Sequence, residues 1–168
     1  LLLFGLLSHG DHVIVSDLEH NSVTRPLTAL STRGVTFDIA DSDNIEASVN
    51  ALIRPETRLI FPTAVSNVTG KALPLRSLAR IAHKNGISFG TDASQAAGHI
   101  PIDMKSDEID YLCTSGHKGL FGIQGSGLLL FNNTPPSPLL YGGTGTESLN
   151  LLQPKIVPES LESGTVAT

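Results

Sequence analysis

Three residues with reactive side chains follow short apolar segments of the sequence at nearly equal intervals. They are an asparagine, an aspartate and a lysine, at Asn67, Asp92 and Lys118. The steps between them are 25 and 26 residues, about one strand–helix–strand unit each. In an open α/β sheet, ligands bind outside the carboxyl ends of the strands. The spacing therefore brings an amide, a carboxylate and an amine towards one crevice.

A carboxylate and a lysine at neighbouring strand ends suit a cofactor that carries a positive ring nitrogen and an aldehyde. Lys118 would form a Schiff base with the aldehyde, and Asp92 would keep the ring nitrogen protonated. Ser115 and His117, just before the lysine, offer small donors suited to a phosphate. His20 follows an earlier apolar segment and could add an imidazole.

Apolar runs alternate with helical periodicity along the chain, which predicts an α/β fold with a mostly parallel sheet. Strands are expected at 13–15, 35–39, 58–61, 87–89, 109–113 and 127–131, and helices at 21–33, 43–53 and 75–84. Asp43 is the expected N-cap of the second of these helices. The opening residues 1–7 are interpreted as the tail of a buried helix that stops near Gly10.

Composition limits the possible classes of protein. The 168 residues are 40% apolar and 16% charged, which is typical of one globular domain. The net charge of −5 without a basic stripe argues against nucleic acid as a partner. The lone Cys113 excludes an intrachain disulfide and fits a reducing compartment such as the cytoplasm. No stretch reaches the roughly 20 apolar residues that a membrane span needs, and a signal peptide is not expected.

Six short motifs occur in an order that resembles the class V aminotransferases, in particular the cysteine desulfurase group. The motif around the lysine is Ser-Gly-His-Lys followed by a glycine-rich run, at 115–127. The others are at 16–22, 65–70, 91–98, 142–145 and 162–165. The match extends over nearly the whole chain. One such motif would be weak, whereas six in order make chance a poor explanation.

The resemblance implies pyridoxal phosphate (PLP) as the cofactor and gives roles to the matching residues. Lys118 would be the Schiff-base lysine, and Asp92 would pair with the ring nitrogen. Gln95 would donate to the phenolic oxygen, and His20 would stack on the ring and move protons.

The remaining matching residues would hold the periphery of the cofactor. Asn67 would lie near the phenolic oxygen or the substrate carboxylate, and Ser115 and His117 would bind the phosphate. Thr165 would reach the phosphate of the other subunit, which implies a homodimer.

The resemblance also implies that residues 1–168 are part of the large domain of a PLP-dependent fold type I enzyme, a three-layer sandwich. The segment before the sheet and the carboxyl-terminal small domain, with the substrate-binding arginine and the sulfur-accepting loop cysteine, would lie outside this chain. The implied reaction is that of a cysteine desulfurase or selenocysteine lyase, which releases sulfur from L-cysteine, leaves alanine, and could pass the sulfur to an acceptor protein. The alternatives are another class V aminotransferase or lyase, and a non-catalytic fragment of the same fold.

Less specific interpretations of the same residues stay open at this point. Helix capping could be the sole role of Asp92, and His117, Asn67 and Gln95 could be turn residues without a part in binding. The run Asp17-Leu-Glu-His20 could suggest a metal site, although its spacing matches no strong zinc pattern. Cys113 is expected to be a buried small hydrophobe rather than a reactive thiol.

Overall fold

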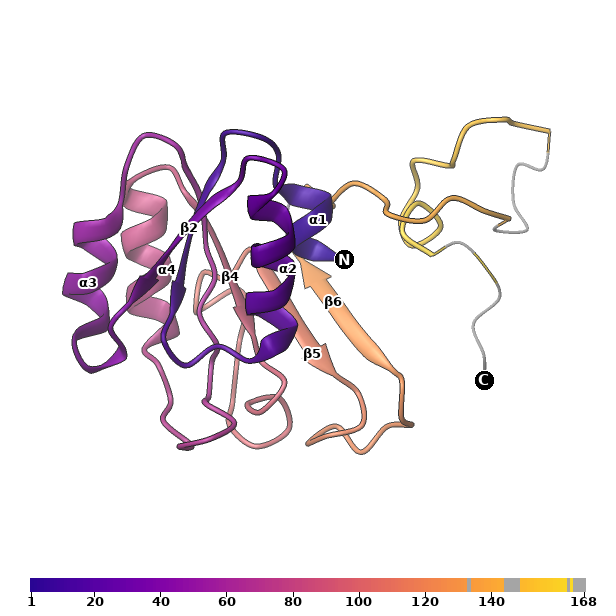
Figure 1. The fold of residues 1–168 in the computed structure, drawn as a ribbon. Coiled ribbons are helices and arrows are strands. Elements are labelled where there is room, and N and C mark those ends of the chain that lie inside the picture. The colour runs from indigo at the N-terminus through magenta and orange to yellow at the C-terminus, as the bar shows by residue number, and fades with distance from the viewer. Residues whose placement is uncertain (133, 144–148, 163, 165–168) are drawn as a thin grey trace.

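The computed structural model describes residues 1–132, 134–143, 149–162 and 164, and its centre is a six-stranded sheet (Figure 1). The strand order is β2-β1-β3-β4-β5-β6. Strands β1 to β5 pair in parallel, and β6 runs antiparallel to β5. The strands are β1 His12–Ser16, β2 Thr36–Ala40, β3 Thr57–Ile60, β4 Ser88–Asp92, β5 Tyr111–Ser115 and β6 Gly127–Phe131. The predicted α/β fold with a mostly parallel sheet is confirmed.

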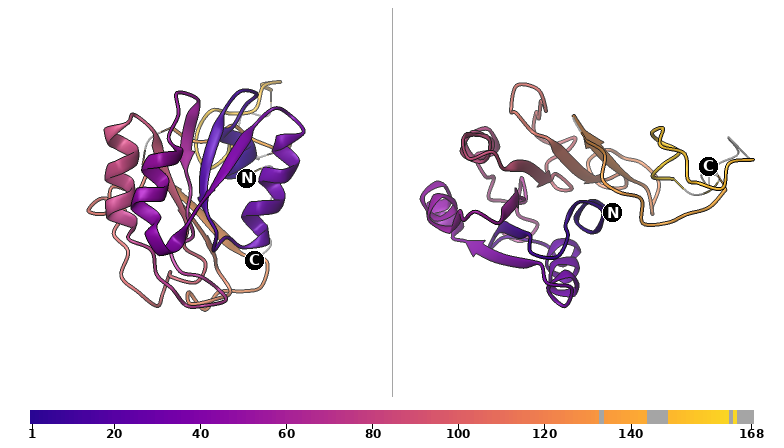
Figure 2. Two further views of the ribbon diagram at one scale, coloured as in Figure 1. Left: turned by 60° about the vertical axis from the view of Figure 1, so that its left-hand side comes forward. Right: turned by 90° about the horizontal axis from the view of Figure 1, so that it is seen from above.

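Helices cover both faces of this sheet, which gives three layers (Figure 2). The helices are α1 Leu2–Leu6, α2 Asn21–Ser31, α3 Ile45–Leu52 and α4 Leu75–Lys84. One hydrophobic core lies under α3 and α4, and the other lies under α1 and α2. In the described part of the chain, no helix has the length and apolar character that crossing a membrane requires.

The central strand β1 shows why the sheet is sandwiched between helices. All five of its residues are buried. Val13 and Val15 pack into the core on the α1–α2 side, whereas Ile14 packs into the core on the α3–α4 side. Successive side chains of a strand point to opposite faces, so a continuous apolar run requires cover on both.

Several helix boundaries differ from the sequence-based expectation, including the end of α2 at Ser31. The predicted N-cap at Asp43 is wrong, because α3 begins only at Ile45 and a short 3₁₀ turn precedes it. Asp41 accepts the backbone N–H of Asp43 at 2.9 Å, while the Asp43 carboxylate pairs with Lys71 Nζ at 2.6 Å. Helix α1 ends at Leu6 rather than near Gly10.

Strands β4 and β5 run further towards their carboxyl ends than the apolar runs predicted. Asp92 and Ser115 are the last residues of these strands. Thr91 is fully buried within β4, and its hydroxyl donates to the carbonyl oxygen of Pro62 at 2.8 Å. A buried hydroxyl with a hydrogen-bond partner costs little in a sheet, so the strand continues through Thr91 to Asp92.

Candidate active site

A pocket of about 300 Å³ lies beyond the carboxyl ends of β1, β3, β4 and β5, a volume at the low end of the range for small-molecule sites. Seven side chains singled out from the sequence line it together: His20, Asn67, Asp92, Gln95, Ser115, His117 and Lys118. Thr165 lies outside the described residues. The topology therefore brings an amine, a carboxylate, two imidazoles and two amides to one cavity, although the segments that carry them are far apart in the sequence.

Asp92 ends β4 at the floor of this pocket, with only 8% of its surface exposed. Its Oδ1 accepts the backbone N–H of Ser94 at 2.9 Å, which closes a tight turn. Residues 94–99 are turns rather than a helix. Asp92 is therefore not a helix N-cap, and its position on a pocket wall leaves its carboxylate available to a ligand.

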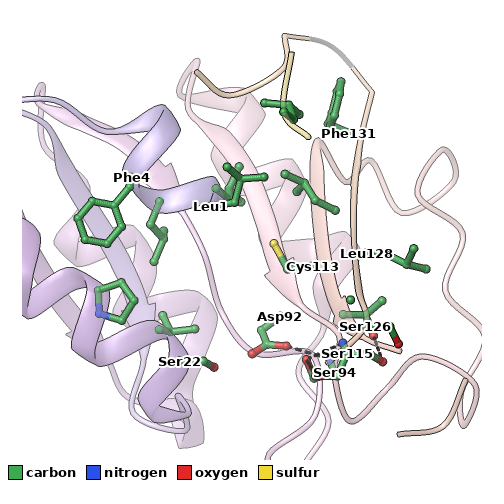
Figure 3. A pocket seen from close by; sticks show the side chains of 18 of the residues that line it. Leu1, Phe4, Ser22, Asp92, Ser94, Cys113, Ser115, Ser126, Leu128 and Phe131 are labelled. Atoms are coloured by element: carbon green, nitrogen blue, oxygen red, sulfur yellow. Dashed lines mark hydrogen bonds between the residues drawn. The ribbon is translucent and has the colours of Figure 1, made fainter. Parts of the chain in front are cut away.

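Hydrogen bonds connect the turn after β4 to the segment that carries the lysine. The Ser94 hydroxyl accepts the backbone N–H of Ser115 at 3.2 Å, and the two hydroxyl oxygens are also 3.2 Å apart (Figure 3). Asp92, Ser94 and Ser115 thus form a continuous hydrogen-bonded link between β4 and β5. Sequence reasoning missed Ser94, although its place between Asp92 and Gln95 could have drawn attention to it.

His20 is the N-cap of α2, and this role fixes its imidazole. The backbone N–H of Ser22 donates to His20 Nδ1 at 3.2 Å, and Ser22 Oγ lies 2.9 Å from the same nitrogen. Because Nδ1 accepts an N–H, the neutral ring carries its hydrogen on Nε2. His20 therefore presents a defined tautomer at the pocket.

The polar side chains of the run that ends at His20 form hydrogen bonds with different parts of the chain. The Asp17 carboxylate accepts the backbone N–H of Ser42 at 3.1 Å, and the Glu19 carboxyl accepts that of Thr63 at 2.7 Å. The His20 ring is bound to Ser22. Among the described residues, no group of three or more His, Cys, Asp or Glu side chains is placed to hold a metal ion.

A second, larger cavity of about 580 Å³ adjoins the site pocket (Figure 3). Helices α1 and α2 form one wall, and β5 and β6 form the other. The two cavities share Ser22, Asp92, Ser94 and Ser115 as lining residues. The carboxylate of Asp92 therefore lies at the boundary between a polar pocket and a mainly apolar one.

Cys113 lies in β5 and lines the larger cavity rather than the site pocket. Burial, reinforced by the negative charge of Asp92, raises the pKa of its thiol to about 12. Since the thiolate is the reactive form, this environment suits a packing residue. The expectation that Cys113 is not a reactive nucleophile agrees with its position.

Native Cys113 is accordingly expected to react with a thiol-specific reagent at pH 8 about 10³-fold more slowly than a free cysteine, because its thiolate fraction is about that much smaller. The rate can be followed by mass spectrometry of the cysteine-containing peptide. The urea-unfolded protein is the control, in which the same thiol should react at the ordinary rate. Equal rates in the native and unfolded states would contradict this result.

Two glycines allow the lysine segment to approach the turn after β4. Gly98 has a left-handed φ of +82°, and a Cβ placed on it would collide with the backbone carbonyl of Gly119, the residue after Lys118. A Cβ on Gly119 would in turn collide with the carbonyl oxygen of Ala97. The segment just after Lys118 therefore packs closely against the turn after β4.

Gly98→Ala is expected to lower the free energy of unfolding by about 3 kcal/mol, through left-handed strain plus steric overlap with the lysine segment. Gly86→Ala is the matched control, because Gly86 also has a left-handed φ, of +69°, but has open space around it. It should cost about 1 kcal/mol. Urea denaturation measures the free energy of unfolding of both variants. Equal losses of stability would show that the close contact with Gly119 does not add to the cost of the substitution.

Comparisons with known proteins identify the family. The model of the aminotransferase class V family matches residues 1–168. The cysteine desulfurase IscS of Methanosarcina thermophila is 35% identical over 84% of this chain and 36% of its own length. The mitochondrial cysteine desulfurase of Saccharomyces cerevisiae is 37% identical over 79% of this chain and 28% of its own length.

The fold agrees with that of a solved cysteine desulfurase. The crystal structure of CsdA from Escherichia coli superposes with a TM-score of 0.85 at 29% identity, covering 95% of this chain and 42% of that chain. The chain spans about a third of the length of the two curated relatives. On the match of the family model over its whole length, this chain belongs to the class V aminotransferase family.

Proposed function

We propose that this chain is the central cofactor-binding part of a PLP enzyme of the cysteine desulfurase group. The observation that carries the proposal is the presence of the Lys118 amine and the Asp92 carboxylate on the walls of one 300 Å³ pocket. Cysteine desulfurases at 35% and 37% identity support the choice of this group within the family.

The chemistry of the donor set fits PLP. The pocket offers a primary amine for the aldehyde, a buried carboxylate for the ring nitrogen and hydroxyl and imidazole groups for the phosphate. When bound, PLP supplies a protonated ring that accepts electrons from the substrate. The chain's own part is to hold the amine of Lys118 and the carboxylate of Asp92 on the walls of the same pocket. The link through Ser94 keeps their two strand ends together.

Each of the other pocket residues singled out from the sequence has a role in this proposal. His20 would stack on the cofactor ring and move a proton through its Nε2, and Gln95 would donate to the phenolic oxygen. Asn67 would lie near that oxygen or the substrate carboxylate. Ser115 and His117, which line the pocket at and just beyond the end of β5, would bind the phosphate. Thr165, outside the described residues, would bind the phosphate of a second subunit in a homodimer.

The proposed substrate is L-cysteine. A cysteine thiolate of the enzyme attacks the substrate sulfur, so that a sulfur–sulfur bond forms, the carbon–sulfur bond breaks and a proton replaces sulfur in the alanine that leaves. An acceptor protein then takes the persulfide sulfur in the cytoplasm. Cys113 is not proposed as the attacking thiol, because it lines the larger cavity rather than the site pocket and burial raises the pKa of its thiol. The attacking cysteine and the substrate-binding arginine would belong to the rest of a protein whose large domain includes residues 1–168.

An activity assay of the full-length protein tests this proposal. With PLP, L-cysteine and a dithiol reductant, it should form alanine and sulfide in equal amounts. Turnover of another amino acid in place of cysteine would assign the protein to a different class V activity. Absence of PLP binding would overturn the proposal.

A further inference from the structure

Glu19 is a half-buried residue whose carboxyl group reaches inwards beside the site pocket without lining it. Its Oε1 accepts the backbone N–H of Thr63 at 2.7 Å, the Ser16 hydroxyl at 2.5 Å and the Ser16 backbone N–H at 3.3 Å. Ser16 ends β1, and Thr63 lies just beyond β3. One oxygen atom of Glu19 therefore joins the ends of two neighbouring strands, and the next residue in the chain is His20.

Thr63 in turn contacts the backbone of Asp92, the residue that would pair with the ring nitrogen of the cofactor. It forms a parallel bridge with Asp92, and its hydroxyl lies 3.1 Å from the carbonyl oxygen of Val65 and 3.3 Å from that of Asp92. The backbone N–H of Ala64 donates to the same carbonyl at 2.8 Å. Glu19 is thus one residue removed from the backbone of Asp92 and covalently adjacent to His20.

The second oxygen of Glu19 has an unusual environment. Oε2 is buried and has no hydrogen-bond partner among the described residues. Burial, with a smaller contribution from the negative charge of Asp92, raises the pKa of Glu19 to about 7. The ionisable groups that line the neighbouring site pocket are His20, Asp92, His117 and Lys118. A carboxyl group under these conditions is well suited to hold structure and poorly suited to bind a ligand itself.

We propose that Glu19 is a positioning residue of the site, which holds the segment that carries His20 in place against the strand ends that carry Thr63 and Asp92. The inference rests on the proposed function, because this geometry matters to PLP only if the pocket binds it. The essential feature is the accepting oxygen. Glutamine keeps that oxygen at the same reach, alanine removes it, and leucine fills the space but accepts no hydrogen bond.

The test uses the full-length protein with Glu19→Gln, Glu19→Ala and Glu19→Leu, and with Glu46→Ala as an exposed control in the first turn of α3. Hydrogen exchange of the Thr63 amide is measured without cofactor, and the PLP Kd is measured by absorbance titration. Alanine and leucine are expected to raise the Kd by about tenfold or more and to speed Thr63 exchange by a similar factor. Glutamine and the Glu46 control should stay within about twofold of wild type in both.

Two results would overturn the inference. One is wild-type Thr63 protection and PLP affinity in the leucine variant. The other is a glutamine variant as impaired as the alanine variant, which would show that the accepting oxygen is not what matters. Failure of the proposed function can be distinguished from failure of this inference. If the proposed function is wrong, the wild-type protein does not bind PLP. The hydrogen exchange of the Thr63 amide without cofactor still shows whether Glu19 holds that segment.

Discussion

Replacing Lys118 with alanine in the full-length protein is expected to abolish the visible absorbance of bound PLP and to lower turnover by at least about 10³-fold. The lysine is the amine of the pocket that can form a covalent bond with the cofactor aldehyde. A loss of 10³-fold corresponds to about 4 kcal/mol of transition-state stabilisation. The measurements are an absorbance scan after gel filtration with PLP and the alanine-forming assay.

Lys84→Ala is the matched control for this variant. Lys84 is an exposed lysine in the last turn of α4, and it does not line the site pocket. Its removal changes the net charge by the same amount and should leave spectrum and turnover as in wild type. A Lys118→Ala protein that kept the wild-type visible spectrum would refute the role of the lysine.

The second large effect is expected at Asp92. Asp92→Asn should still fold and bind PLP, because the amide oxygen can accept the Ser94 N–H as Oδ1 does. A neutral amide cannot keep a pyridine nitrogen protonated, so turnover should fall by about 10² to 10³-fold, or about 3–4 kcal/mol. Steady-state kinetics at saturating PLP measures the loss, and urea denaturation checks that stability is retained.

Asp103→Asn is a close geometric control for this substitution. Asp103 Oδ1 accepts the backbone N–H groups of Lys105 at 2.9 Å and Ser106 at 3.0 Å, in an exposed turn away from the pocket. It therefore reproduces the turn-forming role of Asp92 without access to the cofactor. If both variants kept wild-type turnover, Asp92 would be only a turn residue.

The layer arrangement could be predicted because it depends on a local rule. Apolar runs in the sequence, such as 13–15, alternate with amphipathic helices, and such strands bury both faces under helices. The strand order and the antiparallel direction of β6 could not be predicted, since both depend on which edges meet in space. The predicted cap at Asp43 failed because Asp41, two residues earlier, offers a competing carboxylate.

The position of the pocket could be predicted for a similar reason. Parallel strands end at the same edge of a sheet, so polar residues at strand ends meet there whatever the loops do. The residues that hold them in place were not apparent from the sequence. Ser94 and Glu19 act through contacts with Ser115 and Thr63, which lie 21 and 44 positions away. No local sequence pattern encodes contacts between residues so far apart. The roles proposed for the pocket residues are predictions that the experiments above test.

The proposal that Lys118 holds PLP is tested most directly by identifying the residue to which PLP becomes attached. The full-length protein is incubated with PLP, reduced with borohydride so that a Schiff base becomes a stable amine, and digested for peptide mass spectrometry. One pyridoxyl-modified lysine, Lys118, is expected, and the label should be lost in the Lys118→Ala variant. A label on a different lysine, or none above the level of unspecific surface reaction, would contradict the proposal.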